Sequence, residues 1–280
     1  MAMWTLRLGP HYFDLSRRAL VMGILNRTPD SFSDHGATFA LDALLRRADE
    51  LVAAKADILD VGGVKAGPGP EVSEAEELDR VVPAIEALAA RFEVPISVDT
   101  WNARVLAEAC SAGAVLGNDI SGFGDPDYLP TAARAGASVV ATHIRLAPRV
   151  RDPDPGYADL VPEVARFLTE RAGWALAAGL SAEQVILDAG LDLGKTASQS
   201  AVLLRESAVL AGLGHPLLLS ASNKTFLGVL LDLPVDQRRD ASLAAVAYGV
   251  ARGCRIVRVH DVAGTVRVVR ILERLLEAQP

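Results

Sequence analysis

The sequence is short of cysteine, of aromatic residues and of basic charge, and each shortage removes a class of protein. Only 5% of the residues are aromatic, and the two cysteines, Cys110 and Cys254, have no Cys-x-x-Cys or histidine pairing that would indicate zinc. We therefore expect buried free thiols. With 28 Lys and Arg against 35 Asp and Glu, the net charge of -7 argues against general nucleic-acid binding, which needs a basic face.

Long hydrophobic runs are also absent. No apolar run reaches the length of a membrane span, and residues 1–10 lack the apolar core of a signal peptide. We expect a cytoplasmic protein that does not bind membranes. No Gly-x-Gly-x-x-Gly turn is present, which argues against a doubly wound dinucleotide-binding sheet.

Half of the 280 residues are hydrophobic, so the chain can bury a substantial core, and its apolar runs alternate regularly between short and long. The short runs predict strands at 19–25, 58–61, 96–99, 115–119, 138–142, 185–188, 217–219 and 256–259. The longer amphipathic runs predict helices at 41–54, 73–91, 103–112, 128–135, 159–178, 198–211, 241–251 and 265–277. Eight strand–helix repeats favour a single-domain (β/α)8 TIM barrel over residues 1–280. Residues 4–8 and 12–15 predict a short N-terminal hairpin that caps the N-terminal mouth of the barrel.

The segment 21–36, VMGILNRTPDSFSDHG, changes abruptly from apolar to polar at Asn26. Its first part has the continuous apolar character of a strand buried on both faces, and its second part offers amide, hydroxyl, cationic and carboxylate groups. Taken alone, this segment fits an ordinary surface loop as well as it fits a site.

Polar residues recur at the carboxyl ends of the other predicted strands, where barrels of this kind build their active sites. These residues are Asp60, Asp99, Asn118, Asp119, Thr142, His143, Asp188, Ser220, Ser222, Lys224, Arg258 and His260. An Asp next to an Asn suits the amino-amide edge of a pterin or a guanine, and a cluster of cations suits a diphosphate. The mouth therefore predicts a ligand with a polar heterocycle and an anionic part.

Several of these residues have a structural explanation as well. We expect Asp60 and Asp119 to accept hydrogen bonds from loop backbone, and His143 to be a satisfied core histidine. For Asp99, Asn118, Asp188 and Lys224 the equivalent strand-end positions favour a functional role.

Over nearly the whole chain from residue 20, the sequence resembles the dihydropteroate synthases of folate biosynthesis. The matching segments are GILNRTPDSFSDHG, ILDVGG, ISVDT, GNDISG, ILDAGLDLGKT, SNKTFLG and VRVHDV. The resemblance implies a homodimeric barrel that condenses hydroxymethyl-dihydropterin diphosphate with an aromatic amine, p-aminobenzoate, and releases diphosphate in the presence of Mg²⁺.

The resemblance also implies roles for individual residues. The pterin would be held by Asp99, Asn118, Asp188 and Lys224. The diphosphate would be held by Asn26, Arg258 and His260, with Asn26 contacting Mg²⁺, and Ser222 would contact the carboxylate of the amine. The candidate catalytic residues are then Asp99, Lys224, Arg258 and His260.

The chain departs from the family pattern in the loop after the second predicted barrel strand. Ala66 and Gly67 stand where the family usually has Thr and Arg, a loss that Lys65 or Arg27 would have to offset. Three further replacements, at Thr142, Leu193 and Asn223, bear on the ring and amine pockets. This pattern resembles a divergent second copy of the enzyme found in some actinobacteria. A paralogue that binds pterin with little synthase activity is therefore an alternative, and a folate-dependent methyltransferase on the same barrel is a weaker one.

Overall fold

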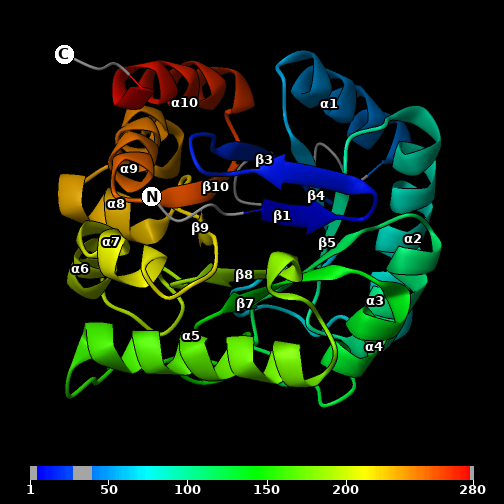
Figure 1. Cartoon of the computed structure of the whole chain (residues 1–280), viewed down its shortest axis with the longest axis horizontal. Coiled ribbons are helices and arrows are strands. Elements are labelled where there is room, and N and C mark those ends of the chain that lie inside the picture. The colour runs from blue at the N-terminus through cyan, green and yellow to red at the C-terminus, as the bar shows by residue number, and fades with distance from the viewer. Residues whose placement is uncertain (1–4, 28–39, 278–280) are drawn as a thin grey trace.

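A computed structural model describes residues 5–27 and 40–277, and its centre is a closed barrel of parallel strands (Figure 1). The barrel strands are β3 (Leu20–Asn26), β4 (Ile58–Gly62), β5 (Ile96–Asp99), β6 (Leu116–Asp119), β7 (Ser138–Thr142), β8 (Val185–Asp188), β9 (Leu217–Leu219) and β10 (Cys254–Val259). Neighbours along the chain pair in register, and β10 closes the ring onto β3. The predicted TIM barrel is confirmed.

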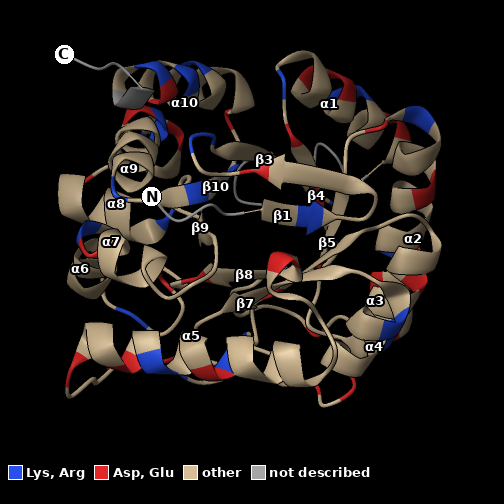
Figure 2. Cartoon of the chain, in the orientation of Figure 1, with Lys and Arg blue, Asp and Glu red and all other residues tan. Residues whose placement is uncertain are grey.

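Helices surround this barrel on the outside (Figure 1). They are α1 (Leu41–Ala53), α2 (Glu74–Arg91), α3 (Ala103–Ser111), α4 (Tyr128–Ala135), α5 (Leu160–Ala177), α6 (Ala197–Arg205), α7 (Ser207–Ala211), α8 (Thr225–Leu231), α9 (Arg239–Ala251) and α10 (Val262–Glu277), with 3-10 turns η1 (Ala182–Gln184) and η2 (Val235–Gln237). Most Lys, Arg, Asp and Glu residues lie on the helices and loops, whereas the strands are largely free of charge (Figure 2). Within the described residues, no helix is both long and apolar enough to cross a membrane.

The alternation of side chains along each strand separates two apolar regions. Outward-facing residues such as Val21, Val61 and Val98 pack against the helices in the larger core. Inward-facing residues such as Met22 and Ile186 fill the lower half of the barrel. The barrel is therefore a packed core and not a pore, and its polar residues are confined to one end.

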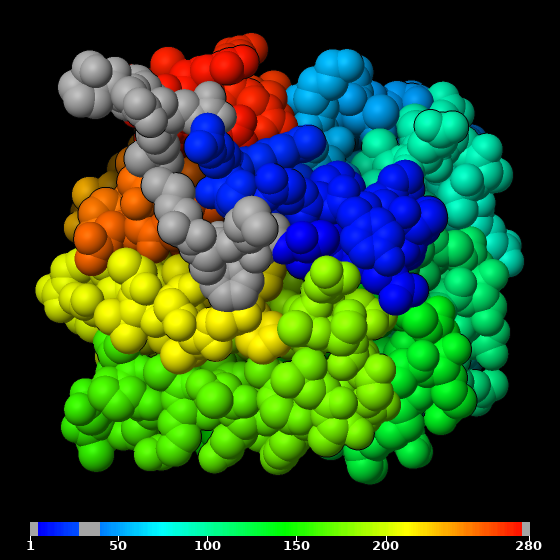
Figure 3. Space-filling view, viewed as in Figure 1, coloured from blue at the N-terminus to red at the C-terminus, as the bar shows by residue number. Residues whose placement is uncertain are grey.

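The N-terminal hairpin closes the opposite end. Its strands, β1 (Thr5–Leu8) and β2 (His11–Asp14), pair antiparallel, and Leu6 and Leu8 are fully buried against the inward-facing barrel residues. In the space-filling view the blue hairpin lies over the middle of this face (Figure 3). This confirms the predicted cap and leaves the carboxyl ends of the strands as the open mouth.

Two predictions for the last third of the chain are wrong in detail. The helix predicted over 198–211 is broken into α6 and α7 at Glu206, because the buried hydroxyl of Ser207 donates to the carbonyl of Leu204 at 2.7 Å and competes with the helical pattern. The sequence analysis also missed α8, whose seven residues are too few to show a helical period. Cys110 and Cys254 are free thiols, as expected, and Cys254 is buried, but Cys110 is only half-buried, so the expected burial is wrong for it.

Candidate functional site

A ring of polar side chains lines the mouth at the carboxyl ends of the strands. Strand register brings them together: Asn26 pairs with Gly62, Gly62 with Asp99, and Asp99 with Asn118. Thr142 pairs with Asp188 on the far side of the ring. Because inward positions alternate along each strand, these residues stand one layer above the apolar filling of the barrel.

The guanidinium of Arg258 lies at the centre of this ring, between two carboxylates. Its Nε donates to Asp60 Oδ2 at 2.6 Å, and its Nη2 donates to Asp99 Oδ2 at 2.7 Å. Asn118 Nδ2 also donates to Asp60 Oδ2, at 3.4 Å. The Asp60 side chain is 0% exposed, and those of Arg258 and Asp99 are 15% exposed. The cluster is thus largely removed from water, where charge-assisted bonds are strong.

Some hydrogen-bonding groups in and beside this cluster have no partner in the protein. Burial, reinforced by the nearby Asp60 carboxylate and opposed by Arg258, raises the pKa of Asp99 to about 7. Within the described residues, Asp60 Oδ1 and Thr142 Oγ1 are buried and have no hydrogen-bond partner. Buried acceptors that lack donors are costly, so they indicate a ligand that supplies N–H groups.

Asp188 and Lys224 lie on the other side of the mouth and attract each other electrostatically. Asp188 Oδ1 accepts the backbone N–H of Gly190 at 2.8 Å, and Lys224 Nζ donates to the carbonyl of Leu191 at 2.6 Å. Burial raises the pKa of Asp188 and lowers the pKa of Lys224, and the attraction between the two charges opposes both shifts. The side chains are held by the same loop and present one acceptor and one donor to the mouth.

Beneath this loop, Lys195 is buried against His143. Its Nζ lies 2.8 Å from His143 Nδ1 and donates to the carbonyl oxygens of Gly190 and Leu193, both at 2.9 Å. Burial, together with the positive charge of Lys195, lowers the pKa of His143 to about 3, so this histidine is neutral. His143 is therefore a satisfied core histidine, as predicted, and Lys195 ties the β8–α6 loop (189–196) together.

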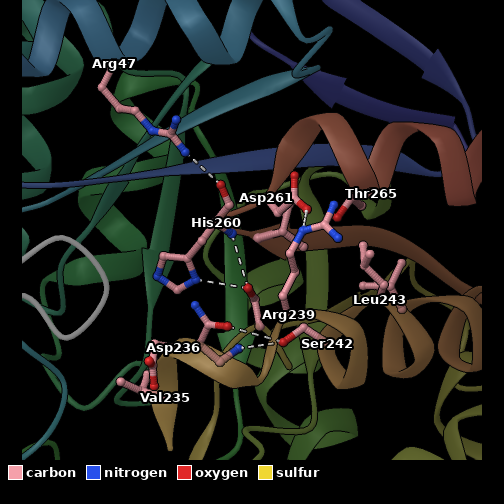
Figure 4. Close-up of a pocket in the computed structure, with 13 residues that line it drawn as sticks. Arg47, Val235, Asp236, Arg239, Ser242, Leu243, His260, Asp261 and Thr265 are labelled. Atoms are coloured by element: carbon pink, nitrogen blue, oxygen red, sulfur yellow. Dashed lines mark hydrogen bonds and ion pairs between the residues drawn. The ribbon is translucent and has the colours of Figure 1, made fainter.

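Ser222 and His260 contact each other at the ends of β9 and β10. Ser222 Oγ lies 3.0 Å from His260 Nδ1, and the same hydroxyl accepts the backbone N–H of His260 at 3.2 Å. A cavity of about 370 Å³ adjoins them, and Arg47 and Arg239 reach into its wall (Figure 4). The wall of this cavity carries charges of both signs, because Asp236 and Asp261 line it as well and Arg239 Nε forms an ion pair with Asp261 Oδ2 at 2.7 Å.

Asn26 is the predicted metal ligand, a role that stays a prediction, and its surroundings leave room for a Mg²⁺. A side chain at Gly62 would contact both Asn26 Oδ1 and Asp99 Oδ2, each 3.6 Å from the position of a Cβ, so the glycine keeps the space between them open. Among the described residues, no group of three His, Cys, Asp or Glu side chains forms a metal cage. Mg²⁺ commonly uses one or two protein oxygens, substrate phosphates and water, which agrees with this donor set.

Arg27 is one of the two residues that would have to offset the loss of Thr and Arg from the loop after β4. Its guanidinium contacts the backbone of α2. Its Nη1 donates to the carbonyl oxygens of Arg80 at 2.6 Å and Asp79 at 3.3 Å. Pro83 has no N–H, so the carbonyl of Asp79 lacks its usual helical partner and Arg27 supplies a donor instead. Arg27 therefore helps to hold α2 against the barrel.

The prediction that Asp60 and Asp119 accept hydrogen bonds from loop backbone is correct for one residue and wrong for the other. Asp119 accepts backbone N–H groups from Ser121 and Phe123, at 2.5 and 2.8 Å, as predicted. The expectation for Asp60 is wrong, because this carboxylate binds Arg258 and not loop backbone. Asp60 is a member of the site that the sequence analysis did not choose. Its place in the strand could have indicated this role. Asp60 is two residues before Gly62, which pairs with Asp99, so its side chain points into the barrel one layer deeper than that of Asp99.

Comparisons with known proteins agree with this geometry. A family model described as pterin binding enzyme matches residues 22–260. Dihydropteroate synthase from Bacillus subtilis is 40% identical over 95% of this chain and 92% of its own length. The inactive dihydropteroate synthase 2 of Mycobacterium leprae is 42% identical over 94% of this chain and 92% of its own length.

The fold is also that of a solved dihydropteroate synthase structure. Crystalline Yersinia pestis dihydropteroate synthase, in complex with a sulfonamide drug, superposes with a TM-score of 0.94. It is 41% identical, and the match covers 98% of this chain and all of that one. Matches of this extent, over the barrel and over every strand end that carries the polar ring, show that the chain belongs to the dihydropteroate synthase family.

Proposed function

We propose that this protein is a transferase that condenses hydroxymethyl-dihydropterin diphosphate with p-aminobenzoate in folate biosynthesis. The observation that carries the proposal is the polar ring, in which Asp60, Asp99, Asn118, Asp188 and Lys224 converge on one buried mouth. Unpartnered acceptors and a donor amide suit the amino-amide edge of a pterin. The relatives named dihydropteroate synthase support the same reaction.

In the proposed reaction, the bond between the pterin methylene carbon and the bridging oxygen breaks, and diphosphate leaves with the bonding electron pair. The lone pair of the neutral aromatic amine then forms the new C–N bond, and the amine releases a proton. No general base is required for the attack, so catalysis is mostly electrostatic. The Asp99 carboxylate, which accepts from Arg258 Nη2 at 2.7 Å, would stabilise the cationic methylene.

The leaving group would be held by His260 and Arg258, and Ser222 would contact the carboxylate of the amine. Arg258 uses Nε and Nη2 for the two carboxylates, and within the described residues its Nη1 makes no hydrogen bond, so both N–H groups of Nη1 remain for an anion. The His260–Ser222 pair lies at the ends of the neighbouring strands. We further propose Mg²⁺ at Asn26, where the cation, when bound, would neutralise charge on the leaving diphosphate.

A second candidate, a paralogue that binds pterin without normal synthase activity, follows from the altered loop after β4. Ala66 and Gly67 supply neither the hydroxyl nor the guanidinium usual in the family, and an inactive relative is among the similar proteins. Losing a cation that stabilises departing diphosphate can slow a reaction roughly a thousandfold. Pterin binding in the absence of diphosphate release would favour this candidate.

The test is diphosphate release from pterin diphosphate with Mg²⁺ and p-aminobenzoate, followed by detection of dihydropteroate. A restoring variant, Ala66→Thr with Gly67→Arg, separates the two candidates. A Cβ at Gly67 meets no atom within 4 Å, so the first carbon of the arginine side chain has room there. A large gain in rate would show that this loop limits the enzyme, and an unchanged rate would move the limit to the amine side of the mouth.

We also propose that the protein is a homodimer that packs through its late barrel helices. Val229, Leu230 and Leu231 of α8 are 65%, 49% and 56% exposed, and Val209 of α7 is 51% exposed. The helices α6–α9 lie on one side of the barrel (Figure 1), and α6 contacts both α7 and α8. We propose that these exposed apolar side chains form the dimer contact. Light scattering of the wild type and of Leu231→Glu tests this, since the variant should be monomeric. The cytoplasmic location expected from the sequence stays a prediction.

A further inference from the structure

Another cavity, of about 350 Å³, lies between the loops that follow β4, β5 and β7. Its apolar lining includes Val64, Val72, Trp101 and Pro148. From α2 it is lined by Glu77, whose side chain belongs to a residue that is only 5% exposed. Among the described residues that line this cavity none belongs to the polar ring, so the cavity is distinct from the proposed pterin site.

The carboxylate of Glu77 is only partly satisfied by the protein. Within the described residues, its Oε1 is buried and has no hydrogen-bond partner. Burial, reinforced by the charge of Glu74, raises the pKa of Glu77, while the Thr100 hydroxyl and the charge of Arg80 oppose the rise. A buried carboxylate oxygen without a donor is costly, so it indicates a ligand that brings N–H groups into the cavity.

Acidic side chains outnumber basic ones in the lining of this cavity. Its carboxylates are those of Glu71, Glu74 and Glu77, and the one cation among its described lining residues is Arg149. Glu74 is already paired, because its Oε1 accepts from Arg104 Nη1 at 2.8 Å. The two carboxylates of Glu71 and Glu77 against the one guanidinium of Arg149 leave an excess of one negative charge, which a ligand with a single positive charge would balance.

The two guanidinium groups beside these carboxylates are held by other groups. Arg149 Nη2 donates to the carbonyl of Pro70, on the altered loop after β4. Arg80, which opposes the rise in the pKa of Glu77, forms an ion pair with the exposed Glu76. Neither guanidinium donates to Glu77 Oε1, so this oxygen stays available to a ligand.

We propose that this cavity binds a small primary ammonium ion that has an apolar body. The ammonium group would donate to Glu77 and Glu71 and lie against the indole of Trp101, since the face of an indole attracts cations. The apolar body would pack against Val64 and Val72. A metal ion does not suit the cavity, because no group of three His, Cys, Asp or Glu side chains in the described part of the chain could hold one. The site is independent of the proposed transferase reaction, since p-aminobenzoate is an anion and would be repelled here.

An NMR titration tests this site without a catalytic assay. The probe is n-butylammonium chloride, compared with 1-butanol and with sodium chloride at the same concentration. The readout is the indole N–H signal of Trp101, identified by its loss in Trp101→Leu. In the wild type, n-butylammonium should shift this signal saturably, and neither comparison should. Glu77→Gln should raise the Kd of n-butylammonium ~10-fold, because the ammonium group loses its buried charged partner.

Two further variants complete the test. Glu86→Gln is the matched control and should leave the Kd unchanged, since Glu86 is an exposed glutamate of the same helix that does not line the cavity. Glu71→Gln should raise the Kd ~3-fold, because the Glu71 carboxylate is exposed. The absence of a saturable shift, an equal shift with 1-butanol or sodium, or an unchanged Kd in Glu77→Gln would overturn the proposal. If Glu77→Gln does not fold, an unchanged Kd in Glu71→Gln would overturn it instead.

Discussion

Replacing Arg258 by methionine should expose the energetics of the central cluster. Arg258 forms ion pairs with both Asp60 and Asp99, at 2.6 and 2.7 Å, and the Asp60 side chain is fully buried. Removing one partner of a buried ion pair typically destabilises a protein by roughly 3–5 kcal/mol, because the other charge stays buried without compensation. We expect a loss of about 3–4 kcal/mol at pH 8, toward the lower end because Asp99 is partly exposed.

The loss should depend on pH in a definite direction. Arg258 lowers the pKa of Asp99, which burial nevertheless raises to about 7. Without Arg258, the folded-state pKa of Asp99 lies further above its unfolded value, so the folded variant takes up a proton at a higher pH than the wild type does. The deficit of the variant relative to the wild type should therefore shrink between pH 8 and pH 5.5, by at most ~1.4 kcal/mol per pH unit.

Urea unfolding of both proteins at the two pH values gives this difference from the midpoints. Arg255→Met is the matched control, because Arg255 lies on the same strand, faces outward and donates to the carbonyl oxygens of Leu15 and Val250 at 3.0 and 3.2 Å. Its effect should be independent of pH. A loss below ~1 kcal/mol for Arg258→Met at pH 8, or one equal at both pH values, would refute the reasoning about buried charge.

Three other perturbations have equally definite expected outcomes. Lys195→Met should lower the free energy of unfolding by about 2–3 kcal/mol, measured in urea, because buried carbonyl oxygens of its own loop lose their donor; an unchanged midpoint would contradict this. Gly63→Ala should cost about 1–3 kcal/mol by the same measurement, since the new Cβ would lie 2.8 Å from Val81 Cγ1, and a neutral effect would show that α2 moves freely. Pterin binding at pH 6 should release up to one proton from Asp99, because the pKa of about 7 falls when N–H donors of the ligand reach the carboxylate. Calorimetry in two buffers of different ionisation enthalpy measures this proton release, which should be smaller at pH 8.5. Equal release at both pH values would exclude Asp99 as the source of the proton.

The sequence predicted the barrel and most of its polar mouth for a simple physical reason. Each barrel strand is a short apolar run that ends at a polar residue, and parallel strands bring these ends to one rim. Asp99, Asn118 and Asp188 were therefore identifiable from position alone. The roles carried over by resemblance, such as the Mg²⁺ contact of Asn26, stay predictions.

What the sequence could not predict depends on contacts between distant residues. Asp60 was assigned to loop backbone because its partner, Arg258, lies 198 residues away and only barrel closure brings them together. Likewise, nothing in the local sequence places Arg149 on the loop that contains Ala66. The break between α6 and α7 depends on one buried hydroxyl, which has no periodic signal.

The most direct test of the central claim is the release of diphosphate and the formation of dihydropteroate by the purified protein. With Mg²⁺, hydroxymethyl-dihydropterin diphosphate and p-aminobenzoate, the protein should form diphosphate and dihydropteroate in equal amounts. The variants Asp188→Asn and Lys224→Met should form much less of either product, because each substitution removes a charged group held at the mouth. Diphosphate release no faster than in the absence of protein would contradict the claim that this barrel is an active dihydropteroate synthase.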